Sequence, residues 1–261
     1  MKTVLNQYTS ILEVNILTLR SKLPRHCWGR SMTKTDDQKI LDLIATKEWV
    51  NIELAFEICV GLNGRYNTQV RKALREIPLL CLQKGLELPY VQSLKNIQML
   101  NWENTYLPTE IGQLIALEEL YIEGGNLVEL PKEMKQLKKL ESLHILTNQI
   151  EVLPPEIGAL SKVNWIRLEE NLLQTIPDEI GELTQLLYLD LGYNELIHLP
   201  ATIGKLENLI ELNLAGNQLI GLPAEIAHLQ KLQKLNLKEN GFLLEDKEHF
   251  QRLLPHCKIY H

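Results

Sequence analysis

The fold is decided by the stretch IPDEIGELTQLLYLDLGYNELIH (residues 176–198), which is followed directly by LPATIGKLENLIELNLAGNQLIG (residues 199–221). Both segments have 23 residues and carry aliphatic residues, glycine and asparagine at matching places. Six copies of this pattern follow one another without insertion or deletion, and they begin at Leu107, Leu130, Leu153, Ile176, Leu199 and Leu222. A fixed period in the low twenties predicts a solenoid in which each repeat forms one turn of a coil.

The spacing of the aliphatic residues within one repeat explains the coil. In the fourth copy, Leu186, Leu189 and Leu191 have the spacing of a short strand and are predicted to point into the core. Ile180 and Leu183 are predicted to line the opposite wall on the return arc. One turn cannot bury these side chains alone, so neighbouring turns stack and their strands pair in a parallel sheet.

The repeat LPxEIGxLxxLxxLxLxxNxL resembles that of leucine-rich repeat proteins, in particular the 23-residue type common in bacterial and intracellular signalling proteins. The resemblance covers somewhat over half of the chain. It implies an α/β fold, a right-handed, horseshoe-shaped solenoid with a parallel sheet on its concave side, a helical N-terminal cap and a short C-terminal cap. It also implies a structural ladder of amides that satisfy backbone groups in the turns, formed by Asn148, Asn171, Asn194, Asn217 and Asn240.

The segments before the repeats are predicted to form a leader and a cap. Residues 1–31 are basic and fit neither a clean helix nor a clean strand, which predicts a disordered or weakly helical leader, or an upstream artefact with Met32 as the true start. Residues 32–85 are predicted to form a helical N-terminal cap, because the first edge of a solenoid must be covered. Its three helices are expected to begin at Thr35, Asn51 and Asn67 as N-caps, the last one stopping at Pro78.

The solenoid is predicted to span residues 86–244, including a degenerate first turn whose aliphatic spacing matches the repeats. Trp102 takes the ladder position in that turn and is expected to pack inside, whereas Gly125 takes it in the first full copy and predicts a looser turn. Residues 245–261 are predicted to form the C-terminal cap, with an amphipathic helix followed by a short strand.

Composition excludes several classes of function. The formal net charge of −6 disfavours general nucleic-acid binding, and no run of 18 apolar residues predicts a membrane span. The four cysteines lack paired spacing, and neither a secretory signal nor an Asn-x-Ser/Thr site is present, which favours a reducing cytoplasm. A monomer is favoured.

The sequence carries no pattern for catalysis. It has no phosphate-binding GxxxxGK[ST] loop and no serine or cysteine with an evident base, so we expect neither an enzyme nor a cofactor. The spacing of His249, His256, Cys257 and His261 matches no common zinc pattern, so we expect no metal.

The outward side chains of the strands are the remaining candidates for function. Side chains alternate along each strand, which assigns these to the concave face. The face positions contain nine acidic and three basic residues. Trp165, Tyr188 and Arg167 are predicted as central anchors for a partner, because exposed aromatics and arginine dominate binding energy at protein interfaces. The other predicted contact residues are Tyr121, His144, Asp190, Tyr193, Glu119 and Glu211.

These residues predict a non-enzymatic scaffold that binds a protein or peptide, and the acids favour a basic partner. Three alternatives stay open. The aromatics can simply stack to stabilise the sheet and the acids can simply solubilise it. The solenoid can serve as a structural spacer or assembly unit. It can also act as a bacterial effector or regulator of a host or partner protein.

Overall fold

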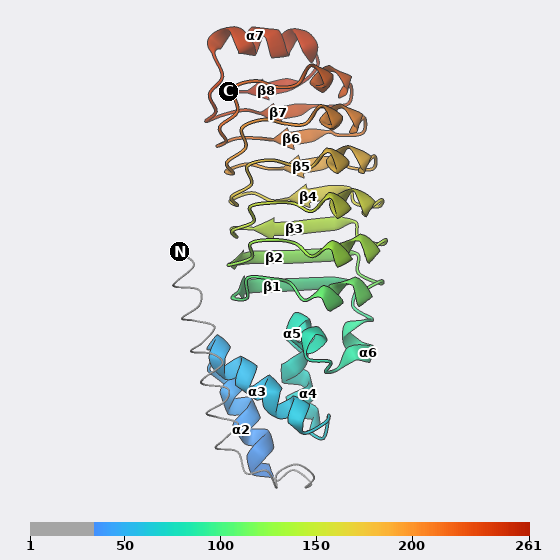
Figure 1. The fold of residues 1–261 in the computed structure, drawn as a ribbon, viewed down its shortest axis with the longest axis vertical. Coiled ribbons are helices and arrows are strands. Elements are labelled where there is room, and N and C mark those ends of the chain that lie inside the picture. Colours follow the sequence, from blue (N-terminus) through green and yellow to red (C-terminus); the bar gives the residue numbers. More distant parts are fainter. Residues whose placement is uncertain (1–33) are drawn as a thin grey trace. The chain divides into compact units, whose positions relative to one another are not determined.

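The structure is a computed structural model that describes residues 34–261 (Figure 1). Contacts within the chain divide it into two compact units; the described part of the first is residues 34–73, and the second is residues 74–261. The predicted leader, residues 1–31, lies outside the described residues, and the predicted boundaries of the helical cap stay a prediction. Between residues 34 and 261, no helix is both long and apolar enough to cross a membrane.

The first unit contains two helices, α2 (Lys34–Ala45) and α3 (Trp49–Gly61), and the beginning of α4 (Thr68–Arg75). Helices α2 and α3 pack against each other. Helix α3 buries one side, as its apolar stripe predicts, through Ile52, Ala55, Phe56 and Cys59.

One of the three predicted helix caps is confirmed and two are wrong. The side-chain oxygen of Asn67 accepts the backbone N–H of Val70 at 2.9 Å, which caps α4. Helix α2 already begins at Lys34, because two acids in its first turn favour an early start, so Thr35 lies inside the helix. A left-handed residue, Lys47 (φ 59°), turns the chain so that α3 begins at Trp49, and Asn51 therefore lies in its first turn.

The second unit is a solenoid built on one sheet of eight parallel strands in chain order, so the α/β solenoid class is confirmed (Figure 1). The strands are β1 (Asn96–Trp102), β2 (Glu119–Gly125), β3 (Ser142–Leu146), β4 (Trp165–Arg167), β5 (Tyr188–Asp190), β6 (Glu211–Asn213), β7 (Lys234–Asn236) and β8 (Lys258–Tyr260). Two short helices precede the sheet, α5 (Pro78–Gln83) and α6 (Leu88–Val91). Pro78 is thus the first residue of α5, since α4 has already ended at Arg75.

Each strand from β1 to β6 is followed by a turn and a short 3-10 helix on the return path. These helices are η2 (Thr109–Gln113), η3 (Lys132–Gln136), η4 (Pro155–Ala159), η5 (Asp178–Glu182), η6 (Ala201–Lys205) and η7 (Ala224–His228). Strand and return helix enclose the predicted core, in which Leu186 and Leu191 are completely buried and Leu189 is 2% exposed. The 23-residue period keeps strands in register, so that Leu189 lies between Ile166 and Leu212.

Both ends of the sheet contain the elements that the sequence predicts. Trp102 at the end of β1 is fully buried and aligns with Gly125 of β2, as expected for packing in a degenerate first turn. Helix α7 (Leu244–Leu253) follows β7 and buries Phe250, and β8 adds the last strand.

The ladder asparagines connect each turn to the repeat before it. Asn171 donates to the carbonyls of Ile145 and Leu168 at 2.8 and 3.0 Å and accepts the N–H of Ile150 at 3.1 Å. At the equivalent place, Gly125 has no such amide, yet β2 continues through it, so the looser turn is not found. A Cβ on Gly125 would lie only 2.4 Å from the carbonyl oxygen of Trp102, so only glycine fits there.

Candidate functional site

The candidate site is the outward side of the sheet, here called the sheet face. Strand pairing arranges its side chains in two columns, because side chains one residue before and one residue after each central aliphatic point outward. The first column contains Glu119, Ser142, Trp165, Tyr188, Glu211 and Lys234, and the second contains Tyr121, His144, Arg167, Asp190, Asn213 and Asn236.

Four rings contact one another across β2, β3, β4 and β5, and we call them the aromatic row (Tyr121, His144, Trp165 and Tyr188). Neighbouring ring centroids are 5.8, 5.2 and 5.5 Å apart, and His144 meets Trp165 edge to face. These are favourable distances for aromatic pairs. Trp165 is 43% exposed, and Tyr193, in the turn after β5, is 50% exposed. The tryptophan is therefore held by its neighbours while one side stays open to solvent.

His144 does not present its ring to a partner as expected, because the side chain is only 5% exposed. The longer rings of Tyr121 and Trp165 cover it from both sides. Burial, and then the nearby guanidinium of Arg167, lower the pKa of His144 from 6.5 to about 4, so the imidazole is neutral near pH 7. The buried imidazole of His144 thus packs against the ring of Trp165 and supports it.

The guanidinium of Arg167 is engaged within the sheet face, because it forms an ion pair with Glu169, two residues further along the chain. Burial raises the pKa of Glu169, the charge of Asp190 raises it further, and Arg167 opposes both. The Oε2 atom of Glu169 is buried and has no hydrogen-bond partner in the described part of the chain. The arginine therefore neutralises a buried carboxylate and keeps about a third of its side chain exposed, 34%.

Charge is unevenly distributed over the sheet face. Six of the nine acids predicted for the face lie in the first three repeats, where Arg167 is the one base among the face positions. These six acids are Glu118, Glu119, Glu123, Glu141, Glu169 and Glu170. In the last three repeats, two lysines accompany three acids. Glu211 accepts a hydrogen bond from the ammonium of Lys234 at 2.6 Å, which raises the pKa of Lys234. The aromatic half of the face is thus strongly acidic, and the other half is close to neutral.

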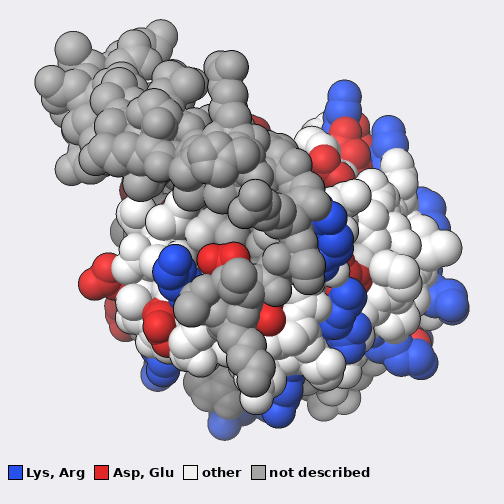
Figure 2. Space-filling model, turned by 90° about the horizontal axis from the view of Figure 1, so that it is seen from below, with Lys and Arg blue, Asp and Glu red and all other residues white. Residues whose placement is uncertain are grey.

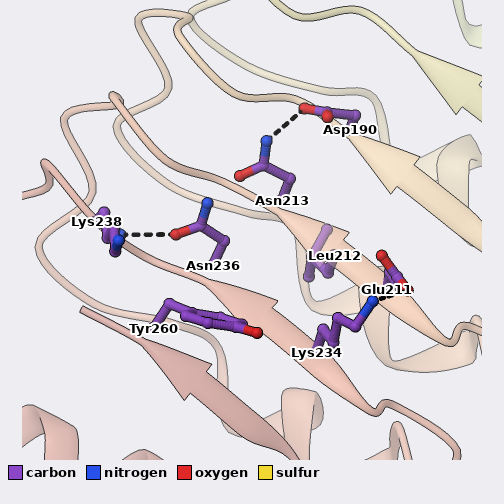
Figure 3. A pocket seen from close by; sticks show the side chains of 8 residues that line it. All are labelled: Asp190, Glu211, Leu212, Asn213, Lys234, Asn236, Lys238 and Tyr260. Atoms are coloured by element: carbon purple, nitrogen blue, oxygen red, sulfur yellow. Dashed lines mark hydrogen bonds and ion pairs between the residues drawn. The ribbon is translucent and has the colours of Figure 1, made fainter.

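The nearly neutral half contains a shallow pocket of about 370 Å³ (Figure 3). Its lining residues come from β5 to β8 and the turn after β7, and are Asp190, Glu211, Leu212, Asn213, Lys234, Asn236, Lys238 and Tyr260. Sequence reasoning placed Asp190 and Glu211 on this face but missed Tyr260. The pairing of Asn236 with Tyr260 spans 24 positions, one more than the repeat, so the fixed period could not assign it.

Three polar side chains end β5, β6 and β7 in the second column, and each bonds to the backbone of the turn that follows its strand. We call them the Asx row (Asp190, Asn213 and Asn236). The side-chain oxygen of each accepts the N–H two residues later, from Gly192 at 2.9 Å, Ala215 at 3.2 Å and Lys238 at 3.3 Å. The Nδ2 atom of Asn213 also donates to Asp190 at 2.8 Å. These bonds fix three side chains along one wall of the pocket.

No other type of site is evident in residues 34–261. Within that range, no group of three or more His, Cys, Asp or Glu side chains is arranged to hold a metal ion. On the end of the molecule seen in Figure 2, both basic and acidic side chains lie on the surface.

Known proteins resemble the chain in its repeats. A family model described as a leucine-rich repeat region matches residues 155–253. No curated protein matches the sequence. A solved internalin from Listeria monocytogenes is 20% identical with a TM-score of 0.56, and the match covers 65% of this chain and 48% of that one.

Two further solved structures are similar. The LRR ectodomain of a plant membrane receptor kinase from Arabidopsis thaliana, in complex with CASPARIAN STRIP INTEGRITY FACTOR 2, is 32% identical with a TM-score of 0.51, over 58% of this chain and 19% of that one. An LRR protein of Leptospira interrogans is 30% identical with a TM-score of 0.44, over 66% and 55%. The chain therefore spans about half or less of the length of these proteins.

Proposed function

Because the chain is a leucine-rich repeat protein, and such repeats generally form protein interaction modules, we propose that its sheet face binds a protein or peptide partner. In this proposal the protein is a non-enzymatic recognition module. Trp165 and Tyr188 are the central anchors, and Arg167 contributes the exposed part of its side chain.

The observation that carries the proposal is the partial exposure of the aromatic row. Trp165 keeps 43% of its surface open although rings contact it on both sides. Large aromatic side chains on a regular sheet lose little conformational entropy on binding, and such residues supply most of the energy at protein interfaces. Stacking alone would stabilise the sheet by about 0.2–1 kcal/mol per pair, and it would not require the open side.

A basic partner segment fits the acidic half of the face. The acids of this half lie on and just before β2, just before β3 and in the turn after β4, close to the aromatic row. In the described structure, Lys95 pairs with one of them, Glu118, at 2.7 Å. An acidic rim attracts a basic segment during encounter and accelerates association, an effect that salt screens.

We also propose that the protein functions in a reducing compartment such as the cytoplasm. The three cysteines in the described residues, Cys59, Cys81 and Cys257, are buried. Burial raises the pKa of Cys257 to about 11, so this thiol is unreactive. Thiols that are buried and protonated suit a compartment in which disulfides do not form.

The experiment that tests the binding proposal is selection of a displayed random peptide library on the full chain. Wild type is compared with Trp165→Ala and with a control, Ile220→Ala, which removes an apolar side chain that is 74% exposed and outside the sheet face. We expect wild type and Ile220→Ala to enrich the same peptides and Trp165→Ala to lose them. Enrichment of the same peptides by Trp165→Ala would contradict the proposal, and no enrichment by any of the three would favour a structural spacer.

A further inference from the structure

We propose that the pocket between β5 and β8 binds a carboxylate group of the partner. The inference rests on the proposed function, since both place the partner on the sheet face, but it concerns a second subsite with different chemistry. The aromatic row would hold an apolar or basic part of the partner. The pocket (Figure 3) would hold an anionic group at β6 to β8, which lie two to four strands from Trp165 on β4.

The pocket offers hydrogen-bond donors in fixed positions. A backbone N–H can only donate, so the oxygens of Asn213 and Asn236 must face the N–H groups of Ala215 and Lys238. Their NH₂ groups then point toward the preceding strand, that of Asn213 toward Asp190 and that of Asn236 toward Asn213, along the lining of the pocket (Figure 3). Asn213 uses one of its two N–H bonds on Asp190, and neither N–H of Asn236 has a partner in residues 34–261.

The charges of the pocket balance, because Asp190 and Glu211 are matched in number by Lys234 and Lys238. Glu211 is matched by Lys234, and Oδ1 of Asp190 already accepts two N–H bonds, from Gly192 and Asn213. Lys238 forms no ion pair with any acid of the described chain. The Lys238 side chain lines the same pocket as the unused amide donors, and a carboxylate can accept hydrogen bonds from both kinds of donor.

The dimensions agree with a group of this size. Asn213 and Asn236 lie on adjacent strands, which are separated by about 4.8 Å, so one carboxylate can accept a hydrogen bond from each amide. Tyr260 closes the pocket on the side of β8, where Lys258 lies 4.7 Å from the centre of its ring. A carboxylate is offered by a peptide C-terminus or by an aspartate or glutamate side chain, and the test separates these sources.

The test follows the side-chain NH₂ signals of Asn213 and Asn236 by NMR in the full chain during titration with four capped peptides. Acetyl-triglycine with a free C-terminus and the same peptide with a C-terminal amide test the terminal carboxylate. Acetyl-Gly-Glu-Gly-amide and acetyl-Gly-Gln-Gly-amide test the side-chain carboxylate. We expect saturable shifts with at least one carboxylate peptide and none with its neutral counterpart.

Two charge variants make the outcome specific. Lys238→Gln should weaken binding of the carboxylate peptide about three- to fivefold, whereas Lys205→Gln, an exposed lysine on η6, should leave it unchanged. Equal responses to charged and neutral peptides, no saturable response to any, or unchanged binding by Lys238→Gln would each overturn the carboxylate subsite. Because Trp165→Ala does not touch this pocket, it should still show the shifts, so failure of the aromatic anchor and failure of the pocket are distinguishable.

Discussion

The two halves of the sheet share one core but differ in how far their strands extend. Strands β2 and β3 continue for seven and five residues, whereas β5, β6 and β7 each stop after three. The buried aliphatics are equivalent in both halves, as the pairing of Leu120 with Leu143 and of Leu189 with Leu212 shows. The difference therefore originates on the exposed side.

The Asx row accompanies the short strands β5, β6 and β7. In the first half, the second column contains Tyr121 and His144, which do not compete for backbone groups, and the ladder continues as far as Glu123 and Leu146. In the other half, an Asp or Asn oxygen accepts the N–H two residues later, while backbone bonds between repeats continue beyond the strands, as from Leu191 to Asn213 and from Tyr193 to Ala215. Strand β4 lies at the boundary, next to the first member of the row. Outward residues thus determine the chemistry of each half.

The largest expected effect tests whether the core is truly common to both halves. Asn171→Ala should lower the free energy of unfolding by about 3 kcal/mol, because it leaves several buried backbone groups without a partner. Asn217→Ala should have a similar effect in the other half. Urea denaturation measures both, and a large difference between them would show that the halves do not share one core.

A pH dependence of the free energy of unfolding, similar or slightly smaller in size, should arise in the aromatic half alone. The pKa of His144 is about 4 in the folded chain and near 6.5 when unfolded, so between these values the unfolded chain binds more protons. The stability that neutral His144 provides is complete above pH 6.5 and is lost as the pH falls toward 4. Wild type should therefore lose about 3 kcal/mol more than His144→Phe between pH 7 and 4.

The raised pKa of Glu169 acts in the opposite direction, since the folded chain holds that proton more tightly and loses stability as the pH rises through the folded pKa. Glu169 is present in both proteins, so its effect largely cancels in the comparison. Urea denaturation across the pH range measures the difference. Parallel curves for wild type and His144→Phe would mean that His144 is not held neutral by burial.

A third prediction concerns the first full repeat, where restoring the ladder asparagine should fail. Gly125→Asn should destabilise the chain by about 2 kcal/mol, because its Cβ would collide with the carbonyl oxygen of Trp102. Thermal unfolding measures this effect. A stabilised Gly125→Asn protein would show that the turn can open and that the long strand β2 does not depend on glycine.

The smallest expected effect tests the Asx row. Asn236→Ala should cost about 1 kcal/mol or less, because it removes one half-exposed hydrogen bond to the N–H of Lys238. Asn236→Asp keeps the accepting oxygen and should cost less than Asn236→Ala. Hydrogen exchange of the Lys238 amide reports the bond directly, and equal exchange in wild type and Asn236→Ala would rule out its role.

The repeat period predicted the core and the register, because buried aliphatics and ladder asparagines must recur at fixed spacing. It also placed Trp165 and Tyr188 on one column. Burial of His144 could not be predicted, since it depends on how the neighbouring rings of Tyr121 and Trp165 lie. Tyr260 was missed because the last strand departs from the period.

The most direct test of the central claim is the dissociation constant of a library-selected peptide, measured by calorimetry with wild type, Trp165→Ala and Ile220→Ala. If the open tryptophan of the aromatic row anchors the partner, Trp165→Ala should bind about 30-fold more weakly, which corresponds to roughly 2 kcal/mol, and Ile220→Ala should bind like wild type. Equal affinity of Trp165→Ala and wild type would contradict the claim that the sheet face is the binding surface.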